Sequence, residues 1–241
     1  MRIAVISDIH GNLEAFEAVL ADMDTAGVDT AYCLGDNVGY GPQPQEVVDR
    51  LRLRGIPSVM GNHELALSDP IFLRWFNPVA RTSLERTRTM LSSDALDFLS
   101  GLPSAMVAEG CRFVHGFPPD SPTTYLFQVG DNGLEKSFVS HGERICFVGH
   151  THELVMISHT GENMARHLLA QGEIHLDRDR RYLINIGSVG QPRDGNNRAK
   201  YIIWDKDRDV LETRFVPYDI AAVVKKIEAA GLPEAHAKRL W

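Results

Sequence analysis

The sequence predicts an α/β fold whose strands end at one shared ligand-binding rim. Residues 1–65 alternate between strand and helix patterns in the order β-α-β-α-β. Six short apolar runs along the chain each end in polar residues, and five of them end in Asp, Asn or His. At 241 residues and 44% hydrophobic content, the chain can bury one full core. Because ligands of α/β sheets bind beyond the carboxyl ends of the strands, these run ends predict a functional site.

The first 65 residues predict three parallel strands joined by two helices. The expected strands are 3–7, 30–34 and 57–60. After the first of them, apolar residues recur with helical spacing from Leu13 to Met23, with Asn12 as the N-cap and Gly27 just past the end. A second helical pattern closes at Gly55. Helical crossovers of this kind connect parallel strands.

The rest of the chain predicts a helical insert followed by a β-rich region. Residues 68–100 show helical patterns without a strand signal, and Asn77-Pro78 is a typical N-cap and first-turn pair. We expect this insert to cover one edge of the site. The strands expected beyond it are 105–109, 111–115, 145–149, 153–158, 164–169, 173–176, 182–186, 200–205 and 209–216. Residues 219–241 predict a C-terminal helix and tail. No linker or repeat interrupts the chain, so residues 1–241 predict a single domain.

Charge and composition limit the classes of partner. The net charge of -7 argues against a surface for stable nucleic-acid or membrane binding. It does not exclude a small phosphorylated substrate, because bound cations reverse the local sign. The first residues enter a strand pattern directly, without a cleavable signal, and no apolar stretch approaches the roughly 20 residues of a membrane span. We therefore expect a cytoplasmic protein; the sequence leaves a homo-oligomer open.

The polar residues at the run ends form a set suited to divalent cations. The set comprises Asp8, His10, Asp36, Asn62, His115, His150 and His152. Mixed oxygen and nitrogen ligands suit Mn²⁺, Fe, Zn²⁺, Co²⁺ or Ni²⁺ better than Ca²⁺ or Mg²⁺. Two such ions would lie roughly 3.5–4 Å apart, and a water between them would supply hydroxide near neutral pH. Each motif alone has an ordinary explanation as a turn or cap, but the whole ordered set is hard to explain as packing. The other five histidines lack such neighbours, so we expect no site role for them.

These motifs carry a family resemblance. The order D-x-H, G-D, G-N-H-E, H-G and G-H-T-H, found between Asp8 and His152, resembles the calcineurin-like metallophosphoesterase superfamily. The resemblance implies a four-layer α-β-β-α double β-sandwich that hydrolyses phosphomonoesters or phosphodiesters. It implies one metal on Asp8, His10, Asp36 and His152, and a second on Asp36, Asn62, His115 and His150. His63 would be the catalytic histidine, contacting a phosphate oxygen or protonating the leaving group.

Departures from the family pattern narrow the branch of the family that the chain resembles. After Gly35-Asp36, Gly39 stands where protein phosphatases have an acidic partner of the catalytic histidine, and Tyr40 stands in place of a phosphate-contacting arginine. The string G-D-N-V-G-Y-G-P is similar instead to small prokaryotic phosphodiesterases related to diadenosine tetraphosphate hydrolases. Tyr40 and Arg193, the latter in a glycine-rich segment, are candidate substrate-binding residues; packing of the turn and a plain surface arginine are the alternatives.

We therefore expect a binuclear, metal-dependent phosphoesterase, with Mn²⁺ as the activating ion. In this hypothesis a metal-bridging hydroxide hydrolyses phosphodiesters, with nucleotide-type substrates foremost. Dinucleoside polyphosphate hydrolysis and phosphomonoester hydrolysis are alternatives within the same class. A metal-holding scaffold for protein interactions is the alternative from another class.

Overall fold

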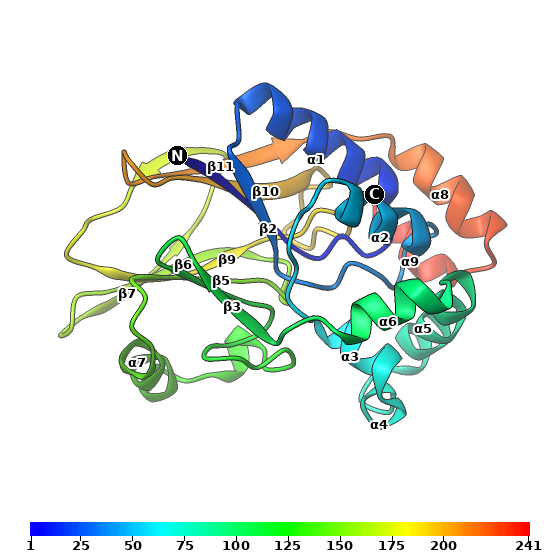
Figure 1. Cartoon of the computed structure of the whole chain (residues 1–241), viewed down its shortest axis with the longest axis horizontal. Coiled ribbons are helices and arrows are strands. Elements are labelled where there is room, and N and C mark those ends of the chain that lie inside the picture. Colours follow the sequence, from blue (N-terminus) through cyan, green and yellow to red (C-terminus); the bar gives the residue numbers. More distant parts are fainter.

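Two β-sheets lie face to face at the centre of the computed structural model, which describes residues 1–241 (Figure 1). The first sheet has the order β2-β1-β10-β11-β8, with strands Thr30–Cys33, Arg2–Ile6, Ala199–Asp205, Val210–Val216 and Gly172–His175. The second has the order β3-β4-β5-β9-β6-β7, with strands Ala105–Ala108, Cys111–Val114, Ile145–Val148, Arg181–Ile186, Leu154–His159 and Met164–Leu168. Parallel pairs sit beside antiparallel ones in both sheets.

Side-chain alternation along the strands produces the sandwich. Successive residues of a strand point to opposite faces of its sheet. In β1, Ile3 and Val5 enter the core between the two sheets, whereas Ala4 and Ile6 pack on the helices outside. In the second sheet, Phe147 of β5 enters the same central core. Both faces of each central strand are thus buried, which explains why these strands are continuous apolar runs in the sequence.

Helices cover the outer faces of the two sheets. Against the first sheet lie α1 (Leu13–Ala26) and α2 (Pro44–Leu53), with α8 (Ile220–Ala229) and α9 (Glu234–Lys238) beside them (Figure 1). The outer face of the second sheet is covered by η1 (Leu126–Gln128) and α7 (Asp131–Ser140). Asn12 caps α1 through its side chain, and Gly27 ends it in the left-handed conformation. The predicted four-layer α-β-β-α architecture is confirmed.

A separate group of helices forms the predicted insert. It consists of α3 (Asn62–Ser68), α4 (Pro70–Leu73), α5 (Pro78–Met90) and α6 (Ser93–Ser100), packed around a small core that also includes Val38 and Val48. The helical character of 68–100 is confirmed, although the helices already begin at Asn62. The side chain of Asn77 caps α5, and Pro78 occupies its first turn as predicted.

One local expectation was wrong, and one helix was not predicted. Residues 57–60 do not form a strand; only Ser58 makes an isolated parallel bridge, to Cys33. Pro57 has no N–H to donate, and Met60 donates to Pro103 outside the sheet. Helix α7 was not expected, because Gly130 and Gly133 at its start are poor helix formers. None of the helices is long and apolar enough to cross a membrane. The assignment of 1–241 to a single domain stays a prediction.

Candidate metal centre

The predicted ligands come together at the carboxyl ends of the central strands. Asp8 follows β1, Asp36 follows β2 and His115 follows β4, while His150 and His152 lie in the turn between β5 and β6. Asn62 opens α3 at the same rim. The carboxylates and imidazoles are almost fully buried. Residues up to 144 positions apart in the chain thus line one small space.

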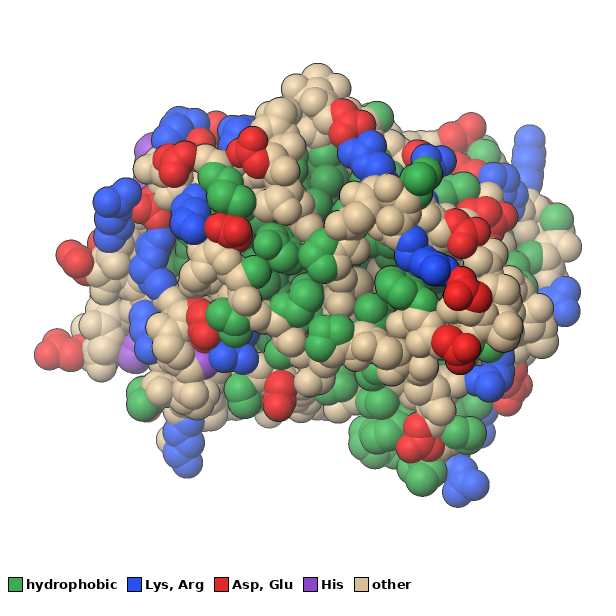
Figure 2. All heavy atoms as spheres, viewed as in Figure 1, with side chains coloured by type: hydrophobic (Ala, Val, Ile, Leu, Met, Phe, Trp, Pro, Cys, Tyr) green, Lys and Arg blue, Asp and Glu red, His purple; other side chains and the backbone are tan.

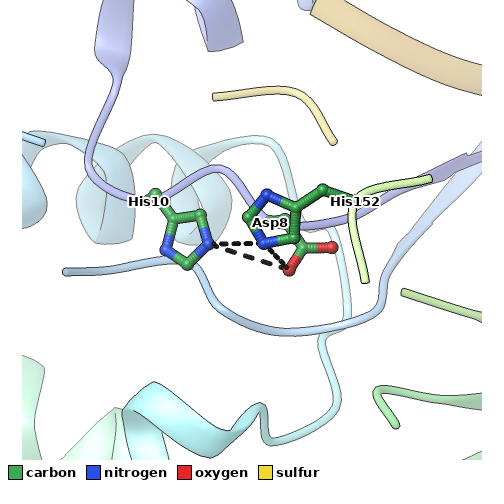
Figure 3. A group of neighbouring side chains, drawn as sticks. All are labelled: Asp8, His10 and His152. Atoms are coloured by element: carbon green, nitrogen blue, oxygen red, sulfur yellow. Dashed lines mark hydrogen bonds and ion pairs between the residues drawn. The ribbon is translucent and has the colours of Figure 1, made fainter. Parts of the chain in front are cut away.

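The first cluster consists of Asp8, His10 and His152 (Figure 3). His152 Nε2 lies 3.1 Å from Asp8 Oδ1. His10 Nε2 lies 3.7 Å from that oxygen and 3.2 Å from His152 Nε2. One carboxylate oxygen and two ring nitrogens therefore converge on a common point, the arrangement from which a transition-metal ion can be held.

The second cluster consists of Asp36, His115 and His150. Asp36 Oδ2 lies 3.3 Å from His115 Nε2, and the same nitrogen lies 3.1 Å from His150 Nδ1 and 3.2 Å from Asn62 Oδ1. Asp36 Oδ2 also lies 3.8 Å from His10 Nε2 of the first cluster. Asp36 thus lies between the two clusters, and it also forms a group with His10 and His63.

Each of the four histidines is held by a backbone carbonyl on its outer side. The ring nitrogen farther from the cluster donates to that carbonyl, which fixes the tautomer and turns the other nitrogen's lone pair inward. The pairs are His10 Nδ1 with Val38 O at 3.3 Å, His115 Nδ1 with Leu34 O at 2.9 Å, His150 Nε2 with Thr123 O at 3.2 Å, and His152 Nδ1 with Gln191 O at 2.6 Å.

This arrangement fits bound cations. Inward lone pairs of His10 and His152 face each other at 3.2 Å, a contact that is repulsive unless a cation or proton lies beside it. Asp8 Oδ1 is buried and accepts no hydrogen bond, and no Lys or Arg forms an ion pair with Asp8 or Asp36. Buried carboxylates need such compensation, and divalent cations bound among these atoms would provide it.

A proton competes for the same place. Burial alone would lower the pKa of His115, but the Asp36 carboxylate outweighs it and raises that pKa to about 9. Burial likewise opposes ionisation of Asp36, yet the neighbouring His115 and His63 hold its pKa well below the usual range. A metal ion would displace the proton from His115, so metal binding should release protons and weaken as the pH falls.

Backbone conformation at the rim is strained. Eight residues other than glycine have a positive φ, and six of them belong to this site. The six are Asp8 (54°), His10 (51°), Asp36 (51°), Tyr40 (64°), His150 (68°) and His152 (62°). Such conformations cost about 1–3 kcal/mol each and persist only where the surroundings impose them. Their concentration here makes the rim the candidate functional region of the chain.

Glu64 positions the loop that carries Asp36, a role that the sequence did not reveal. Its carboxylate accepts three backbone N–H groups, from Asp36 at 2.9 Å, Asn37 at 2.8 Å and Gly61 at 2.8 Å. Burial, and after it the Asp36 carboxylate, raise the pKa of Glu64 to about 7. The sequence offered only a weak signal, because the G-N-H-E string places an acidic residue two positions after Asn62 without indicating which backbone groups it meets.

His63 lies against both clusters without a carboxylate partner on its far nitrogen. Its Nε2 is 3.9 Å from Asp36 Oδ2, and its buried Nδ1 has no hydrogen-bond partner. A Cβ at Gly39 would stand 2.1 Å from that Nδ1, so the glycine both admits the ring and leaves it unpaired. Burial lowers the pKa of His63 to about 4, and the ring is neutral at pH 7.

Tyr40 and Arg193 lie beside the centre. The Tyr40 ring is 4.6 Å from that of His10 and 4.5 Å from that of His63. Burial raises the pKa of Tyr40 to about 12, and the nearby Arg193 guanidinium opposes the rise. Arg193 also donates to Gln191 Oε1 at 3.1 Å. His236, for which the sequence suggested no site role, packs on Tyr40 with ring centroids 4.6 Å apart.

Comparison with known proteins identifies the family. The family model for the calcineurin-like phosphoesterase superfamily domain matches residues 1–209. The chain belongs to this family. A metallophosphoesterase from Sphaerobacter thermophilus has the same architecture, with a TM-score of 0.85 and 39% identity over 100% of this chain and 98% of its own. An uncharacterized protein of Methanocaldococcus jannaschii is 40% identical over 99% of this chain and 97% of its own length.

A more distant similarity covers about half of this chain. The symmetrical bis(5'-nucleosyl)-tetraphosphatase of Delftia acidovorans is 33% identical over 121 residues, which are 48% of this chain and 41% of that protein. Family membership and the buried Asp and His clusters together support a metal-dependent phosphoesterase.

Proposed function

We propose that this protein is a binuclear, metal-dependent phosphodiesterase for small nucleotide-type substrates. The observation that carries the proposal is the position of Asp36. Its carboxylate lies 3.3 Å from His115 of one donor cluster and 3.8 Å from His10 of the other. A carboxylate between two sets of inward-facing imidazoles is the ligand that two neighbouring divalent ions share.

The ligand assignment follows from the two clusters. Asp8, His10, Asp36 and His152 would hold one ion, and Asp36, Asn62, His115 and His150 the other. When bound, the ions would polarise the phosphoryl oxygens and lower the pKa of a water molecule so that it can attack phosphorus. The nitrogen and oxygen donor set suits Mn²⁺, Fe, Zn²⁺, Co²⁺ or Ni²⁺, and Mn²⁺ is the ion we expect to support activity.

His63 would act as a neutral hydrogen-bond donor to a phosphoryl oxygen. No carboxylate lies beside its Nδ1, since Gly39 occupies that position. Burial also lowers its pKa to about 4, which disfavours the protonated form that a general acid needs. Donors aimed at developing charge typically contribute about 10²–10³-fold to turnover. Arg193, close to Tyr40, would bind a second phosphoryl oxygen at the edge of the site.

One alternative substrate class has a specific observation in its favour. Similarity to the symmetrical bis(5'-nucleosyl)-tetraphosphatase favours dinucleoside polyphosphates, although it covers only 48% of this chain. Phosphomonoesters are the other alternative within the enzyme class. A non-catalytic scaffold would tolerate loss of ligands or of His63, whereas this chain keeps the full set. That completeness favours an enzyme.

The test is metal-dependent hydrolysis by chelated and then Mn²⁺-reloaded protein. Substrates are bis(p-nitrophenyl) phosphate, p-nitrophenyl phosphate and diadenosine tetraphosphate, assayed in parallel. We expect diester hydrolysis that disappears with chelator, returns with Mn²⁺ and exceeds monoester hydrolysis. The Glu162→Gln variant, altered at an exposed carboxylate, controls for handling. Preference for either other substrate would reassign the class, and inactivity on all three with metal bound would favour the scaffold.

A further inference from the structure

We propose that the helical insert forms an aromatic subsite that stacks the nucleobase of the phosphoester beside the metal centre. The inference rests on the proposed function and deepens it, because it names the part of the substrate that is recognised away from phosphorus. Four independent features of the structure support it: a cavity, its aromatic walls, an exposed tryptophan and an absence of charge.

A cavity of about 160 Å³ opens between the insert and the segment around Thr123. Cavities of roughly 150 Å³ in other proteins accept a benzene ring, so one planar ring system fits here. Asn62 and His150, both assigned to the second cluster, form part of the wall. A ring in the cavity would therefore belong to a molecule whose phosphate lies at the centre.

Aromatic side chains form a continuous wall from the centre outward. The five aromatic residues lining the cavity are Tyr40, Phe72, Trp75, Phe76 and Tyr125. Tyr125 stacks on His150, with centroids 3.7 Å apart and planes at 20°. Phe76 meets His63 edge-on at 5.0 Å, and farther out Phe72 meets Trp75 at 4.8 Å. Flat aromatic walls favour a planar occupant, and every nucleobase has a face that can stack on them.

Trp75 is left exposed at the outer end of this wall. It is 65% exposed, and Ile71 of α4 is 62% exposed. Figure 2 shows apolar side chains gathered at the lower right of the molecule, where α4 lies in Figure 1. Large apolar groups that remain together on a surface commonly mark ligand sites. A base entering the cavity would cover the tryptophan face that water now contacts.

The cavity contains no charged side chain. None of its ten lining residues is Lys, Arg, Asp or Glu. Away from Asn62 and His150, which would hold metal, a second phosphate would find no cationic side chain in the lining, whereas a neutral heteroaromatic ring needs none. Thr123 and Asn77 supply hydrogen-bonding groups; the Asn77 oxygen caps α5 by accepting from Ala80 N at 3.0 Å, which leaves its amide N–H groups as donors.

The experiment compares two ligands that differ only in the base. Calorimetric titration of the Mn²⁺-loaded protein with AMP and with ribose 5-phosphate measures binding without requiring turnover. We expect AMP to bind ~5–150-fold more tightly, the range that stacking of one base on aromatic side chains provides. Trp75→Ala should remove most of this difference and leave ribose 5-phosphate affinity unchanged, while Trp75→Phe should retain most of it. Trp241→Ala, also at an exposed tryptophan but outside the cavity, should change neither affinity.

The outcomes separate this inference from the proposed function. Equal affinities for the two ligands, no binding of AMP at millimolar concentration, or an unchanged AMP preference in Trp75→Ala would overturn the subsite, even if diesters are hydrolysed. A Trp75-dependent preference for AMP in a protein that hydrolyses no phosphoester would support the subsite and reject the enzymatic proposal. Because Trp75 is largely exposed, its truncation leaves the core intact, and thermal melting of each variant verifies this.

Discussion

Replacing Glu64 by Gln tests how the chain holds Asp36, the proposed shared metal ligand, in place. One carboxylate oxygen, Oε2, accepts from the backbone N–H groups of Asp36 and Gly61, and the other, Oε1, accepts from that of Asn37. Glutamine keeps the shape but turns one of the two acceptors into a donor. The best placement of its amide keeps the oxygen at the Oε2 position and leaves the Asn37 N–H facing an NH₂ group.

The expected cost follows from these contacts. An orphaned buried N–H costs about 1–3 kcal/mol, and each of the two retained bonds loses roughly 1 kcal/mol when its acceptor becomes neutral. The substitution also removes a buried carboxylate, whose pKa is raised to about 7 by burial and by Asp36. That relief offsets part of the loss. We therefore expect Glu64→Gln to lower the free energy of unfolding by about 2–4 kcal/mol at pH 7.

Urea denaturation in the presence of chelator measures this change without a contribution from bound metal. The matched control is Glu162→Gln, whose carboxylate is exposed and has no ion-pair partner; it should change stability by less than about 0.5 kcal/mol. Glu64→Gln should also bind metal more weakly than the unaltered protein, because the loop that carries Asp36 loses its support. A Glu64→Gln protein as stable as the control would refute the argument that these three hydrogen bonds hold the loop.

The remaining predictions concern two histidines. His63→Ala should retain its metal content, measured by atomic absorption, and lower kcat by about 10²–10³-fold, since His63 donates to the substrate rather than to a metal; an unchanged kcat would remove His63 from the mechanism. His236 has its pKa lowered to about 4, first by burial and then by Arg239. As the pH drops below 6.5, the unfolded chain therefore binds a proton at His236 that the folded chain does not bind. The free energy of unfolding should fall as the pH drops from 6.5 toward 4, by up to about 2 kcal/mol at pH 5. His236→Gln should flatten this part of the pH dependence of unfolding relative to exposed His175→Gln, and equal slopes would contradict the assignment.

The sequence predicted the helices and the rim because their signals are local, whereas the four-layer arrangement was implied by the family resemblance. Apolar runs and helical spacing indicate burial directly. Asn12 and Asn77 each predicted a helix start that the structure confirms. Candidate ligands could be named for a related reason: Asp8, Asp36 and His115 each lie just past the end of a buried strand, and the carboxyl ends of such strands meet at one rim. The residue types and their order along the chain were enough to name these candidates, without any knowledge of the distances between them.

What the sequence missed depends on contacts between distant segments. Glu64 reaches backbone groups 27 and 28 positions away, and nothing near it in the sequence indicates those partners. His236 contacts Tyr40 only because α9 folds back beside the centre. The third expected strand failed because the pairing of Pro57–Met60 was decided by a missing N–H and by Pro103, a residue more than forty positions away.

Metal stoichiometry of the Asp36→Asn variant tests the central claim most directly. Asn keeps the size of the side chain but removes the charge and one of the two acceptor oxygens that a shared ligand needs. After reloading with Mn²⁺ and removal of free ion, we expect two ions per chain in the unaltered protein, and also in Asp120→Asn, which changes an exposed carboxyl. Asp36→Asn should lose affinity at both sites together. Full retention of two ions by Asp36→Asn, or clean loss of one with the other unchanged, would contradict a metal centre built around Asp36.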